Sequence, residues 1–153
     1  MSFIKAKKHL EKYKLENNII EFDASSKTVK EAATLLGVKE GKIAKTMSFL
    51  INDKGVLIVA AGDKKIDNAK YKKEFKTKAK MIPKEDVEKI VGHGVGGVCP
   101  FAVNKDVAVY LDVSLKEYDT IYPACGSGNS AVKLSIEDLE KVSNYKAWVD
   151  VCK

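Results

Sequence analysis

The sequence predicts an α/β (α+β) fold, and three observations point to this class. The first is size and composition, because 153 residues with 45% apolar and 31% charged side chains suit one soluble domain over residues 1–153. The second is that segments with apolar residues at helical spacing alternate with short β-rich segments. The third is that turn and capping residues separate these segments, with no internal repeat or linker.

Five segments have the features of helices. The second of them opens with a capping box formed by Thr28 and Glu31, and Gly37 ends it. The fourth begins at Pro83, followed by acidic residues, and Ser135 caps the fifth. The predicted helices are Phe3–Leu15, Thr28–Leu36, Asp67–Phe75, Pro83–Val91 and Ile136–Val142.

Eight segments have the features of strands, because they are short, rich in β-branched or aromatic residues and bounded by turns. A hairpin turn at Asp53–Gly55 is expected to join the second strand to the third. The predicted strands are Ile19–Phe22, Ile43–Ile51, Val56–Ala61, Ala79–Ile82, Val107–Leu111, Thr120–Ala124, Ala131–Leu134 and Lys146–Val151.

Lys45 is unusual within the strand Ile43–Ile51. Side chains alternate between the two faces of a strand, so Lys45 shares its face with Ile43, Met47, Phe49 and Ile51. A lysine on an apolar face is desolvated, and its pKa should fall unless an anion compensates the charge. The alternative is that Lys45 lies at the mouth of the strand and extends its ammonium to water.

The segment Gly92–Phe101 holds four of the ten glycines of the chain. Glycine lets the backbone bend sharply and approach a ligand, and Pro100 restricts Cys99 to extended geometry. We expect a stiff loop whose N–H groups point into a cleft, where they could hold an anion or polarise a carbonyl group. The alternative is a long turn between a helix and a strand. Cys125–Ser130 forms a second tight, polar loop.

The chain is basic, with a net charge of +6, and every basic side chain apart from histidine is a lysine. Eight lysines lie between Lys64 and Lys80, against Asp67 and Glu74. Such a cluster is typical of a nucleic-acid partner, and it equally fits a solvated helix face. Without arginine, contacts to a polyanion would use lysine ammonium groups or backbone amides.

Several classes of protein are excluded by the same sequence. The longest aliphatic run, Val56–Ala61, is too short to span a membrane, and no apolar segment typical of a secretory signal follows the first lysines. Three scattered cysteines and two histidines offer neither a disulfide framework nor a zinc spacing, and no nucleotide-binding motif is present. We therefore predict a cytoplasmic protein without a metal or cofactor.

Five segments together resemble the YbaK/EbsC family, the prolyl-tRNA synthetase associated editing domain. The resemblance covers roughly residues 19–142, and the segments follow the order of the family. They are Lys45-Thr46, Gly62–Asp67, Gly96–Phe101, Asp112–Leu115 and Cys125–Gly128. The resemblance implies a mixed, barrel-like sheet flanked by helices. It also implies an aminoacyl-tRNA deacylase, here short enough to be free-standing.

The resemblance also implies the residues of the site. Lys45 corresponds to the essential lysine of the family, and Gly96–Pro100 to its Gly-x-x-x-Pro loop, so Lys45, Gly96, Gly97, Val98 and Cys99 are the expected catalytic groups. The expected substrate-binding residues are Thr46, Pro100, Phe101, Ser127 and Gly128. The lysines expected on the tRNA backbone are Lys64, Lys65, Lys70, Lys72 and Lys73.

The expected reaction is hydrolysis of mischarged tRNA of the Cys-tRNA(Pro) or Ala-tRNA(Pro) type, with the 3′ end between Lys45 and the Gly96–Pro100 loop. The loop amides would hold the oxyanion or a water, and Lys45 would act by charge or as a proton donor. In the family the terminal ribose hydroxyl of the tRNA is thought to assist. The expected partners are the aminoacylated acceptor end of tRNA and prolyl-tRNA synthetase; neither DNA nor a membrane is expected.

Two alternatives to this hydrolase remain open from the sequence. One is a non-catalytic module that binds aminoacyl-tRNA ends or an amino acid and acts as partner of a synthetase. The other is a cysteine-dependent acyl hydrolase, since Cys99 follows the glycine turn and His93 is near in sequence. A small buried thiol is the simpler interpretation of Cys99.

Overall fold

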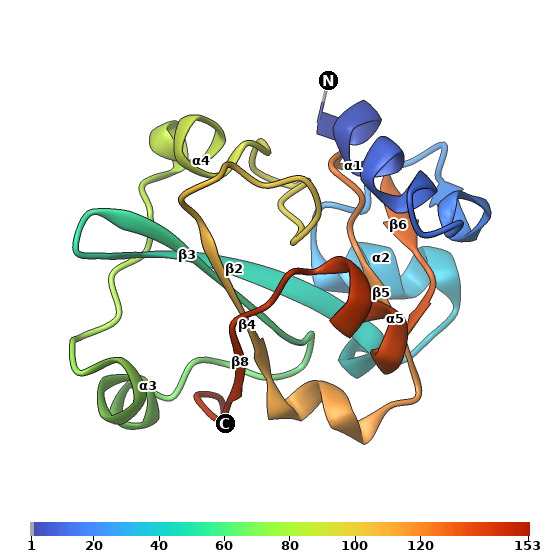
Figure 1. The fold of residues 1–153 in the computed structure, drawn as a ribbon. Helices are drawn as coiled ribbons and strands as arrows, with labels where there is room; N and C mark the ends of the chain where they lie inside the picture. The colour runs from blue at the N-terminus through green and yellow to red at the C-terminus, as the bar shows by residue number, and fades with distance from the viewer. Residues whose placement is uncertain (1) are drawn as a thin grey trace.

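The computed structural model describes residues 2–153, and its centre is a mixed six-stranded sheet (Figure 1). The strand order is β7-β5-β2-β3-β4-β8, in which β2/β3 and β5/β7 are antiparallel and the other neighbours are parallel. The strands of this sheet are β2 (Ile43–Ile51), β3 (Lys54–Ala61), β4 (Ala108–Asp112), β5 (Thr120–Pro123), β7 (Leu134–Ser135) and β8 (Ala147–Val149). A separate antiparallel pair joins β1 (Ile19–Glu21) and β6 (Ser130–Val132).

Five α-helices surround the sheet within residues 2–153, so the predicted α/β class with a mixed, curled sheet and flanking helices is confirmed (Figure 1). They are α1 (Ser2–Glu11), α2 (Val29–Leu36), α3 (Asn68–Phe75), α4 (Lys84–Val91) and α5 (Ile136–Val142). Short 3₁₀ turns occupy Glu16–Asn18, Glu40–Lys42 and Val113–Glu117. None of the helices described over residues 2–153 has the length and apolar character needed to cross a bilayer.

The local signals in the sequence fix the ends of several elements. Thr28 and Glu31 form both bonds of the predicted capping box, and Gly37 ends α2 in the left-handed conformation with φ of 68°. Asp67 caps α3 by accepting bonds from the amides of Ala69 and Lys70. These capping groups satisfy amides that a helix leaves unpaired, which explains why the predicted starts are correct to within one residue.

Several predicted elements differ from the structure by two residues or more, among them the third strand, which begins at Lys54, and the last strand, which ends at Val149. The first helix ends at Glu11, and the hairpin turn falls on Asn52 and Asp53, which both have positive φ. The expected strand Ala79–Ile82 is reduced to one bridge between Met81 and Phe49, although amide bonds still tie it to β2. Ala131–Leu134 is divided into two strands because its halves pair with different partners, β1 and β5.

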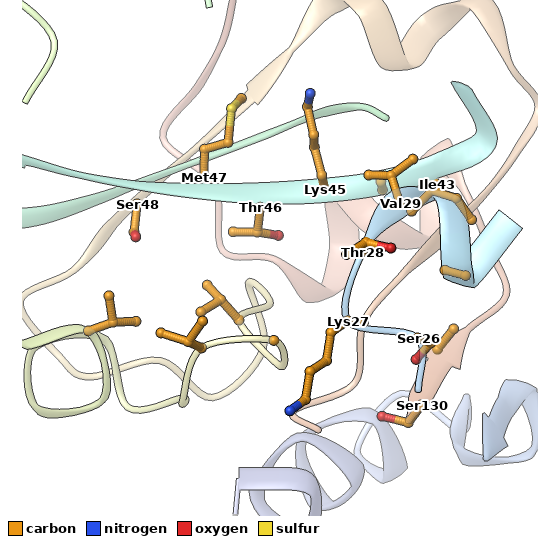
Figure 2. Close-up of a pocket in the computed structure, with 18 of the residues that line it drawn as sticks. Ser26, Lys27, Thr28, Val29, Ile43, Lys45, Thr46, Met47, Ser48 and Ser130 are labelled. Atoms are coloured by element: carbon orange, nitrogen blue, oxygen red, sulfur yellow. The ribbon is translucent and has the colours of Figure 1, made fainter. Parts of the chain in front are cut away.

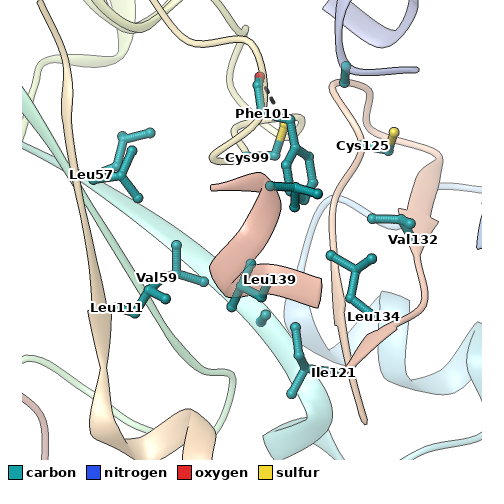
Figure 3. Close-up of a cluster of buried hydrophobic side chains, with 14 of the residues drawn as sticks. Leu57, Val59, Cys99, Phe101, Leu111, Ile121, Cys125, Val132, Leu134 and Leu139 are labelled. Atoms are coloured by element: carbon teal, nitrogen blue, oxygen red, sulfur yellow. Dashed lines mark hydrogen bonds between the residues drawn. The ribbon is translucent and has the colours of Figure 1, made fainter. Parts of the chain in front are cut away.

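Apolar side chains pack on both faces of the β2–β3 ribbon. The main core includes Leu57 and Val59 of β3, Leu139 of α5 and Phe101 of the glycine-rich loop (Figure 3). A second cluster packs Phe49 of β2 and Ile58 of β3 against Tyr71 of α3. Because both faces are covered, alternate residues of β2 enter different environments, and this separates Lys45 from Thr46.

Candidate active site

A pocket of about 290 Å³ opens between β2, the segment before α2, the start of α4 and the glycine-rich loop. Figure 2 shows Thr46 and Ser48 of β2 pointing to the side of the strand on which Lys27 and Ser130 lie. Gly96 and Val98 line the pocket from the loop. The cavity therefore joins segments that are up to about a hundred residues apart in the chain, among them two of the five segments that carry the family resemblance.

The two predicted loops lie in direct contact. A Cβ atom added to Gly97 would lie 2.6 Å from the carbonyl carbon of Gly126 and 2.6 Å from the amide nitrogen of Ser127. Only a residue without a side chain permits this approach of two backbones. Gly97 thereby fixes the Gly92–Phe101 loop against the Cys125–Ser130 loop.

Several amides of the glycine-rich loop have no backbone partner within residues 2–153, and those of Gly96 and Val98 are among them. The amide of Gly97 donates to the carbonyl oxygen of Gly94 at 3.0 Å, which closes a turn. Within residues 2–153 the amides of Gly96 and Val98 donate to no other backbone group, and both residues line the pocket. Unpaired backbone donors beside a cavity are suited to an anion or an oxyanion.

Lys45 does not converge with these amides. Figure 2 shows its side chain on the opposite side of β2 from Thr46 and Ser48, although the residue contributes to the pocket wall. Its ammonium donates a hydrogen bond to the carbonyl oxygen of Lys64, in the turn after β3. Burial lowers the pKa of Lys45, as the apolar face of its strand predicted, while Asp63 and Cys152 oppose that shift. We expected the Lys45 ammonium to lie beside the glycine-rich loop, but in this structure it lies on the other side of β2.

Lys27 lies against Gly96 in the middle of the glycine-rich loop, whereas Lys5 meets the loop only at its start, where it donates to the Gly92 carbonyl oxygen at 2.9 Å. No pattern in the sequence predicted the position of Lys27. A Cβ atom on Gly96 would lie 2.9 Å from Cγ of Lys27, and one on Gly128 would lie 2.7 Å from its Cε. The aliphatic stem of Lys27 thus occupies the space that side chains at Gly96 and Gly128 would need. Its neighbour Thr28 indicates where the helix starts, but an exposed lysine before a capping residue has no sequence feature that predicts contact with the loops.

Hydroxyl side chains and Lys84 supply further polar groups of the pocket. Thr46 Oγ1 and Ser26 Oγ are buried without a hydrogen-bond partner, whereas Ser130 Oγ lies 2.6 Å from Ser127 Oγ at the edge of the second loop. No carboxylate or imidazole lines the pocket within the described chain. The described part of the site therefore offers backbone N–H donors, hydroxyl groups and ammonium groups, and no carboxylate or imidazole that could act as a base.

The rest of the Gly-x-x-x-Pro loop turns into the core. Cys99, Pro100 and Phe101 are buried and none of them lines the pocket (Figure 3). Cys99 Sγ lies 3.5 Å from His93 Nε2, but burial raises the pKa of the thiol far above its usual range and lowers the pKa of His93. A neutral, inaccessible pair of this kind does not support the cysteine-dependent hydrolase.

The five lysines expected on the tRNA backbone lie away from the pocket. Lys70, Lys72 and Lys73 belong to α3, which packs on the face of β2 opposite Thr46 and Ser48. Lys70 Nζ forms an ion pair with Asp150 at 3.2 Å and donates to the carbonyl oxygen of Cys152 at 3.0 Å. Lys64 and Lys65 lie in the turn between β3 and α3, where the carbonyl group of Lys64 accepts from Lys45.

The Asp112–Leu115 motif holds backbone segments together. The Asp112 carboxylate is buried and accepts from the amides of Ser114 and Val151, each at 2.9 Å. Ser114 Oγ accepts from the amide of Ala61 at 3.1 Å, at the end of β3. We refer to Lys45, Asp112 and Ser114 as the bracing cluster, because each bonds to the backbone of a segment distant in sequence.

Comparison with known proteins is consistent with this architecture. The family model described as "Aminoacyl-tRNA editing domain" matches residues 23–142, and this chain belongs to that family. The expectation of an enzyme of the aminoacyl-tRNA deacylase class is thereby confirmed at the level of the family.

Individual relatives and a solved structure extend the comparison. The chain is 47% identical to "Uncharacterized protein YwhH" of Bacillus subtilis (strain 168), over 100% of this chain and 98% of that protein. It is 27% identical to "Putative Cys-tRNA(Pro)/Cys-tRNA(Cys) deacylase EbsC" of Enterococcus faecalis, over 91% of this chain and 87% of that protein. A crystal structure described as "a putative trans-editing enzyme for prolyl tRNA synthetase" has a TM-score of 0.88 and 24% identity, covering 99% and 97% of the two chains, and supports the fold.

Proposed function

We propose that the chain is a cytoplasmic trans-editing hydrolase that removes the amino acid from mischarged tRNA of the Cys-tRNA(Pro) or Ala-tRNA(Pro) type. The observation that carries the proposal is the pocket lined by Gly96 and Val98 of the Gly96–Pro100 loop, whose backbone amides donate to no backbone group within residues 2–153 and are suited to an oxyanion. The names of the Enterococcus relative and of the solved structure support this substrate class. Prolyl-tRNA synthetase, as the source of tRNA(Pro) charged in error, is the proposed partner.

In the proposed reaction the aminoacyl ester enters the pocket with its carbonyl oxygen toward the amides of Gly96 and Val98. A water oxygen bonds to the carbonyl carbon, the bond to the ribose oxygen breaks, and the ribose oxygen takes a proton as the amino acid leaves. An aminoacyl ester is already activated, so positioning and oxyanion stabilisation supply the catalysis. Because no carboxylate or imidazole of residues 2–153 lines the pocket, we propose that the free hydroxyl of the terminal ribose orients the water.

The remaining groups of the expected site have supporting roles in this proposal. Lys45 acts as a positioning residue: its bond to the Lys64 carbonyl holds the turn after β3 behind the strand that carries Thr46. Thr46 contacts the aminoacyl group, and Ser127, which lies beside Ser130, contacts the nucleotide end of the substrate near Lys27, while the buried Cys99, Pro100 and Phe101 shape the loop. Lys64, Lys65, Lys72 and Lys73 would contact tRNA backbone beyond the pocket, whereas Lys70 is engaged by Asp150.

The test is a deacylation assay with a panel of mischarged tRNAs, beginning with alanyl- and cysteinyl-tRNA(Pro). Release of alanine or cysteine faster than the no-enzyme rate, with correctly charged prolyl-tRNA left intact, is the expected result. Saturable binding of the same tRNAs without turnover would replace the hydrolase with the non-catalytic binding module. Absence of both would end the assignment to tRNA(Pro) substrates.

A further inference from the structure

Lys27 is held in a slot that the two glycine-containing loops leave open. Its stem passes over Gly96 of one loop and over Gly128 of the other, and any side chain at either position would displace it. Figure 2 shows Lys27 extending from the segment before α2 along the side of the pocket that faces away from β2. A long side chain is therefore directed by its surroundings, although the residue is exposed.

The Lys27 ammonium has no acidic partner. The ion pairs within residues 2–153 join Lys70 to Asp150 and Lys141 to Glu137. The charge of Lys27 is the smallest of the causes that lower the pKa of Glu31. Glu31 Oε1 already accepts from Ser25 Oγ at 3.1 Å and from the Thr28 amide at 3.2 Å. The ammonium is thus free for an anion that enters with a ligand.

An aminoacylated tRNA end carries only one kind of anion. Its ester is neutral and its amino group is a cation, so the internucleotide phosphates alone can pair with a lysine. Resting on the proposed function, we propose that Lys27 binds the phosphate that joins the last two nucleotides of the aminoacylated end.

This contact also fixes the direction in which the substrate lies. The ammonium of Lys27 repels the α-ammonium of the aminoacyl group, so we place that group toward β2. There Ser48 and the unpaired hydroxyl of Thr46 can accept from an ammonium group, and Lys84, at the start of α4, is a further lysine of the pocket lining. The phosphate at Lys27 and the aminoacyl group at β2 place the ester between them, beside the glycine-rich loop.

The experiment compares Lys27→Ala with Lys30→Ala, an exposed lysine of α2 that does not line the pocket. Each variant is assayed on an aminoacylated tRNA and on the same amino acid esterified to adenosine, which lacks phosphate. We expect Lys27→Ala to raise KM for the tRNA about tenfold, the value of one charge-assisted hydrogen bond, and to leave the adenosine ester unaffected. Lys27→Arg should restore most of the loss, and Lys30→Ala should change neither substrate.

A second variant tests the slot with Lys27 intact. Gly128→Ala should displace the Lys27 stem and reproduce part of the KM effect, whereas Gly94→Ala, whose methyl group meets only Glu88 at 3.5 Å, should not. Thermal melts establish that each variant folds. Equal KM values for Lys27→Ala and Lys30→Ala on tRNA would overturn the inference, and so would an equal loss on both substrates.

If the wild-type protein deacylates no tRNA, the proposed function fails, and affinity for uncharged tRNA still tests Lys27. A Lys27→Ala variant that binds uncharged tRNA as tightly as Lys30→Ala does would then overturn the phosphate contact. Weaker binding by Lys27→Ala, with a salt dependence reduced by about one phosphate contact, would support it.

Discussion

The two sides of β2 are built by different means. On the side of α3, the bracing cluster uses charged and hydroxyl side chains to bind backbone groups of distant segments. On the side of the pocket, backbone packs directly on backbone at Gly97, and the polar groups of Thr46, Gly96 and Lys27 remain unpaired. The comparison teaches that the polar groups around β2 divide into a satisfied set that supports the fold and an unsatisfied set that faces the pocket.

The largest effect should come from Asp112→Ala in the bracing cluster. The substitution leaves the buried amide of Val151 and the amide of Ser114 without their acceptor, and each such loss costs about 1–3 kcal/mol. We expect the free energy of unfolding in urea to fall by about 3 kcal/mol. Asp150→Ala, which removes an exposed ion pair, is the control and should cost less than about 1 kcal/mol. Similar values for the two variants would mean that the bracing cluster does not support the fold.

Gly97→Ala should have the next largest effect, and it tests the other side of β2. The added methyl group would lie 2.6 Å from backbone atoms of Gly126 and Ser127, which cannot rotate away. We expect a loss of about 1–3 kcal/mol in the free energy of unfolding and a greater loss of deacylation, because the two loops must separate. Gly94→Ala is the matched control within the same loop. Wild-type activity in Gly97→Ala would show that contact between the loops is dispensable.

Lys45→Met should alter stability by less than about 1 kcal/mol, because the loss of one hydrogen bond is offset by relief of a desolvated charge. If Lys45 is a positioning residue, kcat for deacylation falls while KM for tRNA stays near the wild-type value. A rise in KM that is abolished by the phosphate-free adenosine ester would instead show that the Lys45 ammonium meets the substrate phosphate. That result would break the distinction between the two sides of the strand.

The smallest effect should be the response of activity to pH near neutrality. Neither histidine lines the pocket, and burial lowers the pKa of His93 below its ordinary value of 6.5. The value of kcat/KM should therefore show no inflection between about pH 6 and 8 that belongs to a histidine. The free energy of unfolding should fall as the pH drops below about 6.5, because the unfolded state then binds the proton that folded His93 resists. A histidine inflection in kcat/KM would bring His93 into the mechanism.

Local patterns in the sequence predicted most of the fold. The alternation of β2, the capping box before α2, the capping Ser135 before α5 and the glycine at the end of α2 are short-range signals, and each corresponds to the observed element. Ala79–Ile82 has strand composition, but only Met81 forms a bridge, because the segment leaves the edge of β2 after a few residues. Propensity describes a residue, whereas a ladder needs a partner strand of matching length.

The site was only partly predictable, because it depends on contacts between segments that are distant in sequence. Alternation placed Lys45 on the face of Met47 and Phe49, but it could not say which face the glycine-rich loop would cover, since both faces of β2 are buried. The position of Lys27 depends on the absence of side chains at Gly96 and Gly128, which lie about 70 and 100 residues further along the chain. No local pattern encodes such a contact.

The burial of all three cysteines has a practical consequence. Cys99 and Cys125 lie in the two loops beside the pocket and Cys152 lies near the C-terminal end, and burial raises the pKa of each thiol, to about 12 for Cys125 and Cys152. A thiol-modifying reagent needs both access and a thiolate, so each sulfur should react only when its own segment opens. Alkylation followed by mass spectrometry would then report, without any introduced label, whether tRNA closes the pocket loops while the C-terminal segment stays unchanged.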